Sequence, residues 1–146
     1  MSKAKIVYLL GFVPNPRFNK RIDAAKGEFD VALICWAKSD SCTFRNVHEG
    51  IGSRVIHIPA NAFDPVARMR PYVTFAKRAI SVLRSEKPDI IHLQGLDMLI
   101  LACWYKRRFD KNVRIVYEVA DLHRLLVDEQ VGVKRRAFAE CVAFFE

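Results

Sequence analysis

The sequence has 146 residues, of which 51% are hydrophobic and 27% charged, a composition that indicates one globular domain and excludes an intrinsically disordered chain. Its 24 basic and 16 acidic residues give a net charge of +8 at pH 7, which favours an anionic partner. A basic face that only keeps the protein soluble explains this charge equally well. No motif of a nucleic-acid-binding module accompanies it, so we expect no nucleic-acid partner.

The N-terminus and the cysteines favour a cytoplasmic protein. No apolar run approaches the roughly 20 residues that a membrane-spanning helix needs. The first apolar stretch is short, rich in strand-forming residues and followed by PNPR rather than by a signal cleavage site, so we predict a first strand there. The four cysteines form no CxxC pair. We expect Cys35 and Cys103 to be reduced core residues, and we expect neither a zinc site nor a disulfide framework.

The apolar segments alternate between strand-like and helix-like lengths. The patterns predict strands over residues 5–12, 30–36, 54–59, 89–93 and 113–119. They predict helices over residues 16–29, from Pro71 to the residue before Pro88, and over residues 96–109 and 133–146. This order is typical of the α/β class with a Rossmann-like, doubly wound parallel sheet. The runs over 89–93 and 113–119 predict strands that are buried on both faces.

The last predicted helix reaches residue 146 without a cap, a glycine or a proline. Its apolar residues Phe138, Val142 and Phe145 need a sheet to cover. We therefore expect a single domain, 1–146, that is truncated at its C-terminus.

Three polar loops follow predicted strands and should meet at the carboxyl edge of the sheet, where open α/β sheets bind ligands. GFVPNPR follows the first strand, QGLD the fourth and EVADLHR the fifth. The first loop has the lone glycine Gly11, so it is not a dinucleotide fingerprint, although it permits close backbone approach to a ligand. Arg17 stands at a helix start, where a cation is unfavourable, which suggests an anionic partner or a plain solvated arginine.

The other two loops each have a structural and a functional interpretation. Asp97 would either cap the next helix or bind a substrate. His92 is more typical of a core histidine than of a catalyst. Glu118, Asp121 and His123 suit general-base work or the binding of sugar hydroxyls, and Asp121 alone would also suit a turn. The sequence has no GxSxG elbow, P-loop or HExxH motif, which argues against a hydrolase, an NTPase and a metalloprotease.

Three stretches resemble the N-terminal domain of family 4 glycosyltransferases of the GT-B type. They are NPRFNKRIDAAKGEFDVALICW, KPDIIHLQGLD and VRIVYEVADLH, in that order along the chain. Arg17, His92, Asp97, Glu118 and Asp121 keep the family pattern. Gln94 and Ala120 replace histidines that are common in the family, and Gly95 replaces a frequent aspartate.

The resemblance implies the N-terminal, acceptor-side half of a GT-B enzyme whose donor-binding domain is absent from these residues. It implies a retaining hexosyltransferase that uses a nucleotide-sugar donor and a cell-surface polysaccharide or glycolipid acceptor. With the loop residues above, it gives nine candidate substrate-binding residues: Gly11, Asn15, Arg17, His92, Gln94, Gly95, Asp97, Glu118 and Asp121. No catalytic residue, metal site or cofactor is assigned within this part, which we expect to be inactive alone.

Two further expectations concern the location of the protein and an alternative class to which it would belong. The resemblance implies a peripheral location at the inner face of a membrane, where basic residues would meet anionic lipid: Arg68, Arg70, Lys77, Arg78 and Lys106 to Arg108. The alternative is a non-catalytic, flavodoxin-like or Rossmann-like binding or regulatory module, since fold alone does not separate the two.

Overall fold

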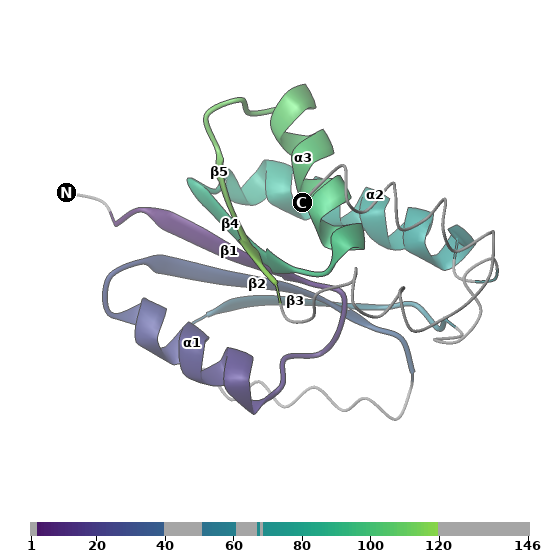
Figure 1. The fold of residues 1–146 in the computed structure, drawn as a ribbon, viewed down its shortest axis with the longest axis horizontal. Helices are drawn as coiled ribbons and strands as arrows, with labels where there is room; N and C mark the ends of the chain where they lie inside the picture. Colours follow the sequence, from purple (N-terminus) through teal and green to yellow (C-terminus); the bar gives the residue numbers. More distant parts are fainter. Residues whose placement is uncertain (1–2, 40–50, 61–66, 68, 120–146) are drawn as a thin grey trace.

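The computed structural model describes residues 3–39, 51–60, 67 and 69–119. Five strands and three helices alternate along these residues (Figure 1). The strands are β1 (Lys5–Leu10), β2 (Asp30–Ala37), β3 (Gly52–His57), β4 (Ile90–Gln94) and β5 (Arg114–Glu118). The helices are α1 (Pro16–Lys26), α2 (Met69–Glu86) and α3 (Leu96–Arg108).

All five strands are parallel and lie in the order β3-β2-β1-β4-β5. One apolar cluster joins the sheet to α2 and α3, and a second joins it to α1, so helices cover both faces (Figure 1). The predicted α/β class with a doubly wound, Rossmann-like parallel sheet is therefore confirmed.

The two clusters follow from the alternation of side chains along the central strands. On β1, Val7 and Leu9 face α2 and α3, whereas Tyr8 and Leu10 face α1. The cluster under α2 is centred on Trp36, whose ring stacks on Phe75 with the centroids 5.0 Å apart. The indole nitrogen of Trp36 donates to the carbonyl of Ile58 at 2.9 Å, so the buried donor is satisfied.

Local sequence signals explain most of the boundaries. The side chain of Asn15 accepts a hydrogen bond from the backbone nitrogen of Phe18 at 3.0 Å and caps α1, and a proline opens the helix. Pro71 lies in the first turn of α2, where its missing N–H costs nothing, so this helix starts two residues earlier than predicted. Lys87 ends α2 with a φ of 48° before the buried Pro88.

Two expectations about burial are wrong. On β5, Arg114 and Val116 are exposed, because α1 covers other strands on that face and β5 pairs only with β4 among the described residues. Cys103 lies on the exposed side of α3, whereas Cys35 is buried and its burial raises the thiol pKa to about 12. The other two cysteines and the predicted helix over residues 133–146 lie outside the described residues.

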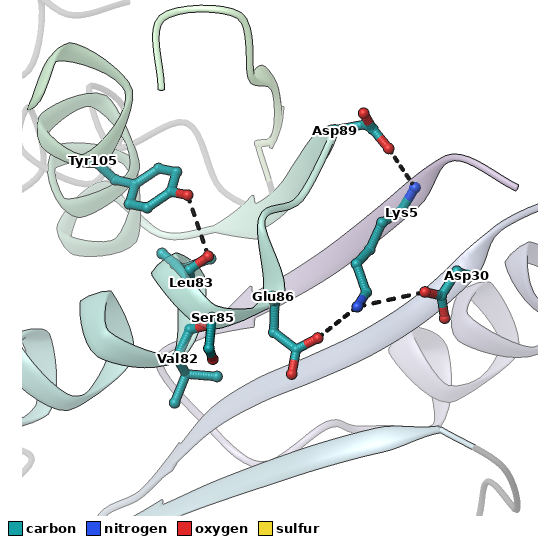
Figure 2. Close-up of polar contacts among 8 residues, drawn as sticks. All are labelled: Lys5, Asp30, Val82, Leu83, Ser85, Glu86, Asp89 and Tyr105. Atoms are coloured by element: carbon teal, nitrogen blue, oxygen red, sulfur yellow. Dashed lines mark hydrogen bonds and ion pairs between the residues drawn. The ribbon is translucent and has the colours of Figure 1, made fainter. Parts of the chain in front are cut away.

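A polar network closes the amino-terminal edge of the sheet (Figure 2). The ammonium group of Lys5 lies 2.7 Å from a carboxylate oxygen of Glu86, at the end of α2, and 3.5 Å from one of Asp30. The hydrogen bond to Glu86 is the main reason that the pKa of Lys5 is raised above 10.5. The carboxylate of Asp89 also accepts from the backbone nitrogen of Lys5 at 2.7 Å. One residue thus ties together α2, β1, β2 and the segment that leads into β4.

We expect Glu86→Gln to lower the free energy of unfolding by about 1 kcal/mol in dilute buffer, because it removes the charge closest to Lys5 in a partly exposed pair. The loss should shrink in 1 M salt, which screens the pair. Urea denaturation at both salt concentrations tests this. Glu28→Gln on the exposed turn after α1 is the control, and an equal loss in both variants would contradict the role given to the pair.

Candidate functional site

The order of the strands determines where a ligand site is expected along the carboxyl edge of the sheet. From β1 the chain crosses through α1 to β2 on one side, whereas β4 lies on the other side and leads into α3 (Figure 1). The loops that leave β1 and β4 therefore diverge, which is the position where doubly wound sheets bind ligands. The register places Leu10, Gln94 and Glu118, the last residues of β1, β4 and β5, side by side.

On the side of α3, the carboxylate of Asp97 lies between two glycines. A methyl group added to Gly11 would stand 3.5 Å from one Asp97 oxygen, and one added to Gly95 would stand 2.8 Å from the other. Gly95 also has a φ of 94°, which L side chains rarely adopt. The two glycines therefore leave the space that the carboxylate occupies.

Asp97 does not cap α3, contrary to one of its two predicted roles. The N-cap position belongs to Gly95, whose carbonyl accepts from the backbone nitrogen of Leu99 at 3.1 Å, so Asp97 falls within the first turn. There its carboxylate accepts from the backbone nitrogen of Met98 at 3.0 Å and its charge suits the positive end of the helix. The hydroxyl of Tyr72 donates to the Asp97 carbonyl at 2.7 Å and ties this turn to α2.

On the side of α1, three basic side chains converge on the carboxylate of Glu118. Nη1 of Arg21 lies 2.6 Å from Oε2, Nε2 of His92 lies 3.6 Å from the same oxygen, and Nη2 of Arg17 lies 3.9 Å from Oε1. Nη1 of Arg21 is buried and forms an ion pair with Glu118, but it makes no hydrogen bond to another described residue. The Glu118 side chain is 15% exposed, whereas that of Arg17 is 69% exposed and remains accessible to a ligand.

Aromatic rings surround the histidine of this cluster. The ring of His92 lies 4.9 Å from that of Tyr8 and 6.3 Å from that of Phe18, centroid to centroid. Burial against them lowers the pKa of His92 below 6.5, and Arg21 lowers it too, while Glu118 opposes the shift. Near neutral pH the imidazole is therefore uncharged and is able to accept or donate one hydrogen bond.

The structure sorts the predicted site residues into two groups. Gly11, Gly95 and Asp97 lie together beside α3, and Arg17, His92 and Glu118 lie together beside α1. The other two described residues have structural positions. Asn15 serves as the cap of α1, and Gln94 ends β4 between its strand neighbours. Asp121 and His123 lie outside the described residues, so their predicted roles stay predictions.

Arg21 and Tyr8 were missed in the sequence. Arg21 follows Arg17 by four residues, a spacing that places both guanidinium groups on one face of α1, so the sequence contained the signal for Arg21. Tyr8 looked like an ordinary core residue, and its burial raises the pKa of its phenol. No group of three or more potential metal ligands occurs within the described part of the chain.

Comparisons with known proteins assign the chain to a family. Residues 23–145 match the glycosyl transferase 4-like domain, and the chain belongs to this family. Its glycosyltransferase-type function follows from that membership. The family match was anticipated by the three stretches quoted above. No curated protein gives a match.

Solved structures support the fold alone. The C-terminal domain of a hydrogenase from Pyrococcus furiosus is similar with a TM-score of 0.58 and 15% identity, over 82% of this chain and 94% of that chain. A UDP-galactose 4-epimerase is similar with a TM-score of 0.35 and 13% identity, over 62% of this chain and 37% of that chain, which is too weak to inform the site.

We expect Gly95→Ala to destabilise the protein by about 1–3 kcal/mol, because the new side chain is strained at a φ of 94° and meets Asp97. Gly27→Ala is the matched control. Gly27 has a φ of −64° and open space around its Cα, so the same change there should be neutral or slightly stabilising. Urea denaturation of both variants measures the difference, and equal effects would contradict the tight fit at Gly95.

We expect His92 to titrate below 6.5 in an NMR experiment, and further below in Glu118→Gln, which removes the group that opposes the shift. Because the folded state binds the proton less tightly than the unfolded state, stability falls as the pH drops from 6.5 toward the folded pKa. Above pH 6.5 the contribution of His92 to the free energy of unfolding does not change with pH. A His92 pKa that rises in Glu118→Gln would show that the carboxylate is not in contact with the ring.

Proposed function

We propose that this domain forms the acceptor-side wall of a GT-B glycosyltransferase. The observation that carries the proposal is the arrangement of Asp97 beside α3 and the Arg17–His92–Glu118 group beside α1, at the carboxyl edge of a family 4-like domain. In the full-length enzyme a second, donor-binding domain would face this edge. The sugar would move from a nucleotide-sugar to a hydroxyl of a cell-surface polysaccharide or glycolipid, with retention at the anomeric carbon.

The chemistry of the two groups supports such a role. Transfer breaks the bond between the anomeric carbon and the donor phosphate and forms one to an acceptor oxygen, whose proton must leave. Asp97 presents a carboxylate oxygen between two glycines, which suits the orientation of a hydroxyl. Arg17 presents an exposed guanidinium, which suits a phosphate or carboxylate of the acceptor. Glu118 would act through its contacts with Arg17, Arg21 and His92, which it orients, rather than by direct contact with the acceptor.

The expected location follows from the same proposal. A nucleotide-sugar donor places the reaction in the cytoplasm, and a lipid-linked acceptor would place it at the inner face of a membrane. The non-catalytic alternative predicts no turnover with any donor, and nothing in the described residues favours it over the family assignment.

In the full-length enzyme we expect Asp97→Asn and Arg17→Ala each to lower kcat/KM by about tenfold or more, because each removes a charged hydrogen-bonding group from the acceptor. Release of the nucleoside diphosphate, measured with a panel of nucleotide-sugars and acceptors, gives the rate. Asp23→Asn and Lys20→Ala on the exposed surface of α1 are the controls and should keep the wild-type rate.

The isolated 146 residues should transfer no sugar in the same assay, because the donor phosphates need a second domain. Wild-type rates in both site variants would place the acceptor elsewhere. Loss of folding in Asp97→Asn, detected by circular dichroism, would make that carboxylate structural. Transfer by the isolated residues would refute the two-domain proposal.

A further inference from the structure

The charges beside α1 do not cancel one another. Arg17 and Arg21 contribute two positive charges, and Glu118 contributes one negative charge. His92 is uncharged near neutral pH, because its pKa is lowered. Two positive charges and one negative charge leave one positive charge in excess. A group of this kind at the carboxyl edge of the sheet attracts an anionic ligand.

Arg17 carries the charge that Glu118 compensates least. Nη1 of Arg21 lies 2.6 Å from Oε2 of Glu118, whereas Nη2 of Arg17 lies 3.9 Å from Oε1, which is too far for a hydrogen bond. The Arg17 side chain is also the most exposed of the group. A guanidinium presents several N–H donors in one plane, so it can bind two oxygens of a carboxylate or phosphate at once.

The start of α1 adds to the positive charge of Arg17. The first turn of this helix contains Arg17 and no acidic residue. The N–H groups at the start of a helix carry a partial positive charge, so a cation there increases the local positive potential. This arrangement is unfavourable for the helix alone, and a bound anion would relieve it.

His92 makes the binding of an anion depend on pH. Groups from three elements face its ring: Tyr8 of β1, Phe18 and Arg21 of α1, and Glu118 of β5. Burial lowers the pKa of His92, as does the charge of Arg21, whereas Glu118 raises it. An anion bound by Arg17 would lie close to the carboxylate that Arg17 and His92 share, and it would favour the charged ring as Glu118 does.

We propose that Arg17, supported by Arg21 and Glu118, binds an anionic group of the acceptor, so that the enzyme takes acceptors with a uronic acid or a phosphate in preference to neutral sugars. The two sources share one chemistry, a negative group with at least two oxygens within reach of one guanidinium. The inference rests on the proposed function for the identity of the ligand as an acceptor. Binding of the anion itself requires neither donor nor turnover, so the two statements can fail separately.

The test is an NMR titration of the full-length protein, without donor, with glucuronate, glucose 6-phosphate and glucose. These sugars differ at one carbon, which carries a carboxylate, a phosphate or a hydroxyl. At pH 7.5 and constant ionic strength we expect glucuronate or glucose 6-phosphate to bind about tenfold more tightly than glucose, because Arg17 contacts the charged group. The tighter of the two identifies the source of the anion. Equal binding of all three sugars, or no binding, would overturn the proposal.

Glucuronate also tests the link with His92, since its carboxylate keeps the same charge from about pH 5 to 8. Saturating glucuronate should raise the pKa of His92, whereas glucose should leave it unchanged. By linkage, the affinity for glucuronate should rise as the pH falls toward the pKa of His92, which lies below 6.5. Glucuronate that binds without any change in the pKa of His92 would place the anion at another site and refute the proposal.

Arg17→Ala should weaken glucuronate binding about tenfold and abolish the change in the pKa of His92. Arg17→Lys keeps the charge but loses the planar donors, so it should recover part of the affinity. Lys20→Ala removes the same charge from an exposed position of α1 and should bind as the wild type does. Equal losses in Lys20→Ala and Arg17→Ala would show an effect of net charge alone. If Arg17→Ala does not fold, the titrations of the wild type decide the question.

Turnover separates this inference from the proposed function. If the full-length enzyme transfers sugar equally well to neutral and acidic acceptors, the inference fails while the acceptor-side role of Asp97 stands. If glucuronate binds as expected but no donor is turned over, the anion site stands and the enzymatic proposal fails.

Discussion

The central strand β1 is the constraint on which the rest of the structure depends. It is hydrogen-bonded in parallel to β2 on one side and to β4 on the other, and its alternating side chains enter both apolar clusters. A parallel neighbour is reached only through a crossover, and crossovers have one hand. Because the chain leaves β1 toward β2 and later returns to β4, the helices lie on opposite faces and the loops separate at the carboxyl ends of these strands.

The ion pair between Arg21 and Glu118 connects helix α1 to the last strand of the described sheet. It joins α1, which packs near β1 and β2, to the end of β5, two strands away. A partly buried ion pair adds little net stability once desolvation is included, but removing one partner leaves the other charge buried. Its main effect is to hold the carboxylate of Glu118 where Arg17 and His92 also reach it.

Elements with strong local signals were predictable from the sequence. Apolar runs predict the buried strands β1 and β2. The backbone chemistry of proline and the capping by Asn15 set the start of α1, and Pro88 sets the end of α2. The exposure of Val116 and Cys103 was not predictable, because it depends on which helices reach β5 and the outside of α3. A strand looks equally apolar in the sequence at the centre and at the edge of a sheet.

The candidate site, too, could be predicted from the sequence only in part. Arg17, His92 and Glu118 were predicted as site residues from a helix start, a strand and a strand end, and the pairing of β4 with β5 brings His92 near Glu118. Their part in binding stays a prediction. Their grouping with Arg21 depends on the angle at which α1 crosses the sheet, which no local pattern states. The predicted capping role of Asp97 is wrong, because α3 begins at Leu96 and the cap position falls on Gly95. Its role in substrate binding stays a prediction.

Tyr72 contributes to two surfaces at once. Its ring lines a groove between α2 and α3, and its hydroxyl donates to the carbonyl of Asp97 at the carboxyl edge of the sheet. Phenylalanine would preserve the ring and lose the donor, and short polar side chains would lose both the apolar surface and the reach. Among divergent relatives, position 72 should therefore change in step with the turn at 95–97 rather than drift among aromatic residues. Sequences in which the two change together would mark branches where this edge of the sheet has been rebuilt.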